Sequence, residues 1–234
     1  MYKDHFWIDY RFHFYNERPD MHFTVLLDKT TMVALPPEES EPQEWTRLSF
    51  CQCDICPLEP EDGAQCPVAY NISGLAGKFT DVYSIEQAQM VVTVPEREYS
   101  KEGKVTEGLR SLIGVYLATS GCPHMSLLKP MARFHLPFAS MMETVYRHVG
   151  NYLLWQYCKS NDDTQVPDLT LQGLLEKNDK TNMVNRGICK RLEQVTAADA
   201  NRNALAILGT IALILQQELN THLESLKPLY DGIS

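Results

Sequence analysis

The chain has 234 residues, with 30 acidic and 21 basic side chains that give a formal net charge of −9 at pH 7. This charge argues against general binding to nucleic acids or anionic membranes, because both are negatively charged themselves. Hydrophobic residues make up 44% of the sequence, but the longest apolar run, residues 204–215, is shorter than the roughly 20 residues that cross a bilayer. We expect a globular cytoplasmic protein without membrane insertion, since the N-terminal "MYKDHFWIDYRF" also lacks the apolar core of a secretory signal.

The first fifty residues show the two-residue period of strands. Every second residue is aromatic or aliphatic between positions 6 and 14, and the alternation returns between positions 21 and 27. The turn-forming stretch "NERPD" lies between them, which predicts an antiparallel hairpin. With a third short strand predicted at residues 31–35, residues 1–50 form a β-rich N-terminal subdomain.

Residues 51–234 are predicted to form a cysteine-anchored, mainly helical domain. One further strand is predicted at residues 89–94, and the following "PEREYSKEG" is predicted to be a loop. Helical spacing of apolar residues predicts helices at residues 67–79, 105–119, 126–134, 140–159, 168–176, 182–195 and 199–226. The fold class is therefore α+β, with an N-terminal antiparallel β-sheet, a cysteine-rich metal-binding loop and a C-terminal helical bundle.

Four of the seven cysteines fall within "CQCDICPLEPEDGAQC", residues 51–66. Clustered cysteines in a reducing compartment indicate metal or redox chemistry more often than disulfides. The spacing of Cys53 and Cys56 lets one tight turn direct both sulfurs at a metal, and the polar loop after them can return Cys66 to the same metal. The fourth ligand is either the nearby Cys51 or the distant Cys122.

The dipeptide Cys-Pro favours Cys122 as the fourth ligand. A helix is predicted to begin at the proline after Cys66 and again at the proline after Cys122, and free N–H groups at a helix start stabilise a thiolate. We therefore predict a metal site made of Cys53, Cys56, Cys66 and Cys122, with Cys51 and His124 as alternative ligands. A closed set of four thiolates is typical of structural zinc, and an iron–sulfur cluster is the alternative cofactor.

No phosphate-binding glycine loop, zinc-protease motif or nucleophile elbow occurs in the sequence. The segment "KPMARFHLPF" contains Arg133 and His135, and His135 could act as an acid or base only with a positioned carboxylate such as Glu143. A connector between helices explains the segment more simply, so we assign no catalytic residue. Arg186, Lys190 and Arg191 are predicted to form a small basic patch on a solvated helix face.

The last predicted helix, residues 199–226, is apolar on two sides in its first half. Such a helix lies at the centre of its own domain or is shared with a partner. A homodimer through this helix is therefore a hypothesis.

Several segments resemble a family of uncharacterised bacterial proteins, a domain of unknown function. They are "CDICPL" with "CPVAYNI", "GLRSLIGVYLATSGCP", "KPMARFHLPF", "ETVYRHVGNYLLWQY" and "ADANRNAL". The resemblance implies no activity, and the cysteines that match its pattern are Cys53, Cys56, Cys66 and Cys122. The sequence thus predicts a non-enzymatic adaptor or assembly protein with structural zinc, which binds protein partners. The alternative is an iron–sulfur or thiol redox protein, or a metalloenzyme, that uses the same cysteines.

Overall fold

The computed structural model describes residues 4–36, 42–76, 78, 82–83, 85–160, 166–195 and 219–232. Four strands form one antiparallel sheet in the order β2-β1-β3-β4. They are β1 (His5–Phe14), β2 (Met21–Asp28), β3 (Gln87–Val94) and β4 (Arg97–Lys104).

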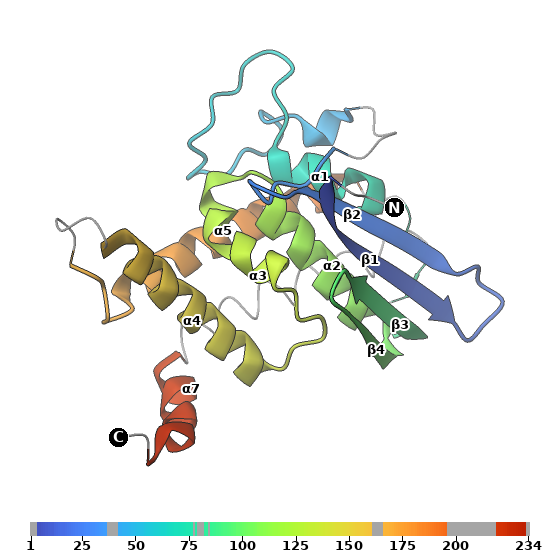
Figure 1. Ribbon diagram of the computed structural model, residues 1–234. Helices are drawn as coiled ribbons and strands as arrows, with labels where there is room; N and C mark the ends of the chain where they lie inside the picture. The colour runs from blue at the N-terminus through green and yellow to red at the C-terminus, as the bar shows by residue number, and fades with distance from the viewer. Residues whose placement is uncertain are drawn as a thin grey trace.

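The described helices gather on one side of this sheet (Figure 1). The α-helices are α1 (Pro67–Ala76), α2 (Val105–Thr119), α3 (Lys129–Arg133), α4 (Met141–Ser160), α5 (Gln172–Val195) and α7 (Leu219–Leu226). The short 3-10 helices are η1 (Glu44–Thr46), η2 (Pro123–Leu128) and η3 (Lys227–Tyr230). The described part of the chain contains no helix long and apolar enough to cross a membrane.

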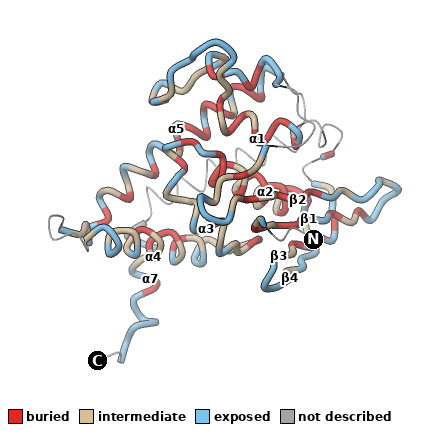
Figure 2. The backbone as a smooth tube through the Cα atoms, turned by 45° about the horizontal axis from the view of Figure 1, so that its top comes forward, coloured by how far each residue is buried: buried red, intermediate tan, exposed pale blue. Residues whose placement is uncertain are grey.

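The two faces of β1 explain why the helices occupy one side. The apolar set that alternates along β1, including Ile8, Tyr10 and Phe12, is buried in the main hydrophobic core. On the opposite face Asp9 accepts hydrogen bonds from Arg11 and from residues of β2, so that face is polar. Buried residues lie along β1, α2 and α1, so the core lies between the sheet and the helical layer (Figure 2).

The α+β class, the antiparallel N-terminal sheet and its hairpin are confirmed, but the sheet extends beyond the first fifty residues. Strands β3 and β4 come from the predicted helical domain and complete the sheet beside β1. The prediction of a loop after residue 94 is wrong for Arg97–Lys104, because these residues form the edge strand β4. The strand predicted at residues 31–35 is reduced to a single bridge between Leu27 and Ala34.

The observed helices agree with the predicted ones in their central residues and differ in where neighbouring helices begin and end. Helix α2 has the predicted bounds, and Gly121 follows it at φ 84°, the left-handed conformation that ends helices. The helices predicted at residues 168–176 and 182–195 are one continuous helix, α5, since the polar residues between them include no proline or glycine that would break it. Of the helix predicted at residues 199–226, only α7 falls within the described residues, so the proposed dimer helix lies mostly outside them.

Candidate functional site

The cysteine loop is closed at its base by short backbone pairing. The Leu48 N–H donates to the Ala64 carbonyl and the Cys66 N–H donates to the Thr46 carbonyl, both at 2.7 Å. These bonds place Cys66 directly beside the segment that leads into the loop. The following residue, Pro67, begins α1, so the sequence correctly placed Cys66 at a helix start.

Cys53 and Cys56 lie in one tight turn, in which the Cys56 N–H donates to the Cys53 carbonyl at 2.8 Å. Cys51 lies outside this turn, with an exposed side chain and a positive φ of 45°. Cys122 is the N-cap residue of η2, and the helix begins at Pro123 as predicted. Both Cys66 and Cys122 are buried in the main core.

One hydrogen bond joins the turn to the distant helix start. His124 Nε2 donates to the carbonyl of Ile55 at 2.7 Å. Ile55 lies between the two cysteines of the turn, and His124 follows Cys122 by two residues. Residues far apart in sequence are thus held together, and the Nε2 nitrogen of His124 is occupied by a backbone oxygen.

The four thiols also affect one another electrostatically. Burial is the main cause that raises the pKa of Cys53 to about 11, and the nearby Cys66, Cys56 and Cys122 contribute to this rise. Burial likewise raises the pKa of Cys122, with further contributions from Cys66 and Cys56. Negative charge on one sulfur therefore disfavours charge on the others, as expected for thiols gathered in one place without a cation between them.

A buried arginine lies beside these thiols, and its positive charge acts against the rise in the pKa of Cys53. Arg191 is fully buried and donates hydrogen bonds of 2.9, 2.7 and 3.1 Å to the carbonyls of Trp45, Arg47 and Leu48. Its Nε–H has no hydrogen-bond partner in the part of the chain that the structure describes.

The prediction of a solvated basic patch is therefore wrong for Arg191, although Arg186 and Lys190 are exposed. The sequence contains a signal that could have shown this. Arg191 follows the buried Val184 by seven positions, which is two helical turns, and so lies on the core face of α5.

The donor atoms suit zinc, but their side chains are not closed around a common point. Within residues 4–232, leaving out the gaps given above, no group of three or more His, Cys, Asp or Glu side chains is arranged to hold a metal ion. Cys53 Sγ instead lies against α5, where a Cβ at Gly187 would be only 2.4 Å from it. A metal would require the sulfurs to turn toward one another.

The other candidates from the sequence do not converge. Arg133 pairs with Glu96 at 2.9 Å and lies over the ring of Phe6. Glu143 Oε2 accepts hydrogen bonds from the N–H and hydroxyl of Ser140, the arrangement of a capping box at the start of α4. These contacts place Glu143 at the start of the helix and not at His135, which agrees with assigning no catalytic role to the pair.

His135 instead meets residues from the sheet and α2. The Tyr10 hydroxyl lies 2.5 Å from His135 Nε2 and 3.2 Å from Ser111 Oγ. Burial lowers the pKa of His135 to about 3, and the charge of Arg147 adds to this effect. The imidazole is thus neutral at pH 7, and its partners were not predicted because they lie far from it in the sequence.

A family model described as a domain of unknown function, DUF6901, matches residues 8–231. The chain belongs to this family. The match spans the sheet, the cysteine loop and the helices, and it confirms the prediction of a family without a known function. The comparisons with curated proteins and with solved structures each found no match.

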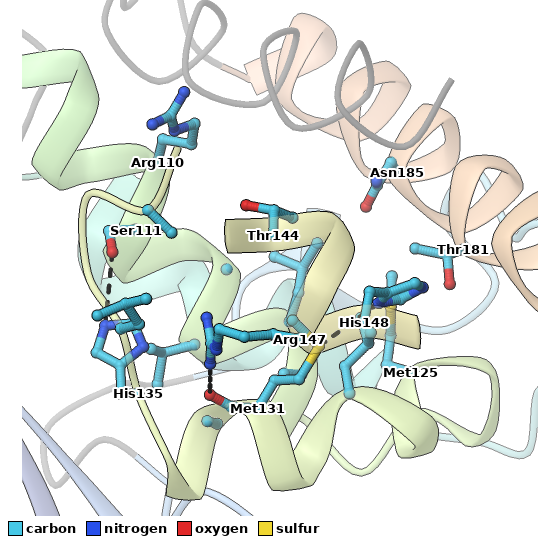
Figure 3. Close-up of a pocket in the computed structure, with 18 of the residues that line it drawn as sticks. Arg110, Ser111, Met125, Met131, His135, Thr144, Arg147, His148, Thr181 and Asn185 are labelled. Atoms are coloured by element: carbon cyan, nitrogen blue, oxygen red, sulfur yellow. Dashed lines mark hydrogen bonds between the residues drawn. The ribbon is translucent and has the colours of Figure 1, made fainter. Parts of the chain in front are cut away.

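The DUF6901 chain also has a pocket that the sequence did not reveal. It has a volume of about 210 Å³ and lies between α2, the segment from η2 to residue 139, α4 and α5. Figure 3 shows polar side chains from these elements around it, including Ser111, Thr144, Arg147, His148 and Asn185. A signal for part of this pocket was present, since Asn178, Asn182 and Asn185 recur at helical spacing and all three are buried.

Proposed function

We propose that this chain is a non-enzymatic adaptor or assembly protein with a structural zinc ion bound by Cys53, Cys56, Cys66 and Cys122. The observation that supports this proposal most directly is the hydrogen bond from His124 to Ile55. It docks the two-cysteine turn on the helix start that bears Cys122. This contact brings the two local sequence motifs together, which supports a shared set of sulfur ligands, and the exposed Cys51 lies outside the turn.

The charge of the surroundings also suits a thiolate-bound metal. Zinc with four thiolates carries a net charge of about −2, since each thiolate contributes one negative charge. Arg191 is buried and, among the described residues, forms no ion pair with a carboxylate. A negatively charged zinc centre would supply the missing counter-charge, and the free Nε–H of Arg191 is a suitable donor to a sulfur.

Zinc at this position would stabilise the fold rather than catalyse a reaction. Four protein ligands leave no open coordination position for a substrate, and the free energy of binding adds to the free energy of folding. For a role in assembly, α4 exposes large apolar side chains that a protein partner could cover. They are Met142, Tyr146, Leu154 and Tyr157.

Metal analysis of the full chain, purified in reductant without oxygen, tests the proposal. We expect about one zinc per chain and no visible colour. Cys122→Ser should lose the zinc and lower the melting temperature, because one ligand is gone. Cys51→Ser is the matched control, and it should keep both the zinc and the melting temperature.

Two results would contradict this assignment. A brown protein that contains iron and sulfide would replace zinc with an iron–sulfur cluster on the same cysteines. Loss of zinc in Cys51→Ser but not in Cys122→Ser would instead show that the four cysteines of residues 51–66 form the site without the helix start.

A further inference from the structure

The pocket between α2, α4 and α5 differs in charge from the rest of this acidic chain. Two arginines line it, Arg110 and Arg147, while its described lining contains no aspartate or glutamate. Glu143 attracts Arg147 from nearby but does not line the pocket. Positive charge without lining carboxylates favours a negatively charged occupant.

The two arginines have different surroundings. Arg147 donates from Nη2 to the carbonyls of Met131 and Phe134 at 2.8 and 2.9 Å, which leaves its other N–H groups available. Arg110 makes no hydrogen bond or ion pair within the described part of the chain, and it is only partly exposed. Arg147 thus has a structural task in holding the connector, whereas Arg110 does not.

Buried amides with unmatched hydrogen-bonding groups provide a second, independent indication of a ligand. Asn178 and Asn185 line the pocket and are only 3% and 4% exposed. Asn178 Oδ1 accepts a hydrogen bond from His148 Nε2 at 2.7 Å, but Asn178 Nδ2 and Asn185 Oδ1 have no hydrogen-bond partner among the described residues. Buried polar groups are nearly always paired, so these atoms indicate a polar occupant.

Most of the remaining lining is apolar. Its larger members come from η2, α3 and the connector after α3, and they are Met125, Leu128, Met131, Leu136 and Phe138. A volume of about 210 Å³ accommodates a small molecule rather than a peptide or nucleotide chain. An occupant therefore needs an apolar body together with its polar group.

We propose that this pocket binds a small organic anion with an apolar body, whose charged group lies at Arg110 and Arg147. An oxygen of the anion accepts from Asn178 Nδ2, and a hydroxyl or amine on the ligand donates to Asn185 Oδ1. The anion could be a carboxylate or a phosphate ester, because both offer oxygens to a guanidinium. This binding site is separate from the cysteine cluster and does not depend on zinc.

Three probes with the same apolar body test whether binding to the full chain requires a negatively charged ligand. Benzoate, phenyl phosphate and benzyl alcohol share a phenyl ring, and only the first two are anions at pH 7. Titrations followed by ligand-observed NMR and by melting temperature should show saturable binding of at least one anion and no comparable binding of benzyl alcohol. A preference for benzoate identifies a carboxylate ligand, and a preference for phenyl phosphate identifies a phosphate ester.

Variants of Arg110 test whether the probe binds in this pocket. Arg110→Gln should weaken binding of the preferred anion about tenfold, the effect of losing one charge-assisted contact. Arg110→Lys should restore most of it, which separates lost charge from a disturbed fold. Arg186→Gln removes the same charge from an exposed position outside the pocket, and it should bind as the unaltered chain does.

Equal binding of benzyl alcohol and the anions would overturn the proposal, as would the absence of binding by both anions at millimolar concentration. An equal loss in Arg186→Gln and Arg110→Gln would also overturn it, because the effect would then reflect net charge alone.

Discussion

Arg191 shows how a single residue can support both packing and the candidate metal site. Its guanidinium donates the hydrogen bonds that water would otherwise supply to three carbonyls in the segment that leads into the cysteine loop. They are the carbonyls of Trp45, Arg47 and Leu48. Without it, the carbonyls of Trp45 and Leu48 would lose their buried donor, and each unpaired buried group costs about 1–3 kcal/mol. The Arg47 carbonyl would keep the hydrogen bond that it accepts from the Phe50 N–H at 3.1 Å.

Arg191→Leu should therefore lower the free energy of unfolding by about 3–5 kcal/mol. Urea denaturation followed by circular dichroism measures the change. Arg186→Leu on the same helix is the control and should shift stability by less than about 0.5 kcal/mol, since Arg186 is exposed. Equal effects of the two variants would show that the buried hydrogen bonds contribute nothing.

At this scale the sequence predicted what depends on local spacing. The turn of Cys53 and Cys56 and the helix starts after Cys66 and Cys122 follow from near neighbours, and the structure contains them. The contact between Tyr10 and His135 joins residues from opposite parts of the chain, and no local pattern encodes it. Whether the four thiols bind zinc stays a prediction.

Among the elements, α2 is the helix that connects the sheet to the rest of the helical layer. It approaches β1 and β3 at Gly108, where a Cβ would lie 2.6 Å from both Phe12 Cε1 and Met90 Sδ. Only glycine permits this approach without moving its neighbours. The packing of α2 on the sheet is thus fixed by one missing side chain.

Gly108→Ala should destabilise the protein by about 1–3 kcal/mol, because the added methyl group overpacks a filled core. Gly150→Ala is a matched substitution in α4, at an exposed position with nothing within 4 Å of the new Cβ. It should stabilise the protein by up to about 1 kcal/mol through helix propensity. Thermal and urea unfolding compare the two, and a loss of stability in both would refute the steric explanation.

For most elements with an apolar face the type followed from the sequence, with the strand predicted at residues 31–35 as an exception. Strand β4 lacks one, since its sequence "REYSKEGK" is polar on both faces, and it pairs only along its edge with β3. A strand of this kind leaves no periodic apolar signal, so it was assigned to a loop. Helix α5 shows the reverse case, in which a polar stretch interrupted the pattern without interrupting the helix.

Two histidines of the described helical layer, the half-buried His135 and the buried His148, carry neutral imidazoles at pH 7. Burial lowers the pKa of His135 to about 3, and burial also lowers the pKa of His148. In the unfolded chain these histidines have the ordinary pKa of about 6.5, so below this pH they bind protons while the folded histidines stay neutral. Their contribution to stability is therefore complete above about pH 6.5 and is lost as pH falls toward the folded values.

Stability should thus fall between pH 6.5 and 4.5, by up to about 1.4 kcal/mol per pH unit for each histidine. Most carboxylates remain ionised above about pH 5.5, so the upper half of this window reports mainly on the imidazoles. Urea denaturation across it should give a shallower slope for His135→Gln than for the unaltered chain. Parallel slopes would show that His135 is protonated in the folded protein.

The sheet order described above also determines how the chain can fold. Strand β1 pairs with β2 through a short hairpin. Its other edge pairs with β3, with Asp9 opposite Thr93, and this pairing cannot form until the distant β3 reaches it. The segment between β2 and β3 includes the cysteine loop and α1, and closing so long a loop has an entropic cost that slows folding. A metal that gathers Cys53, Cys56 and Cys66 early would shorten the free part of that loop. Metal supply would then govern how quickly the newly made chain reaches its final form as well as how stable that form is.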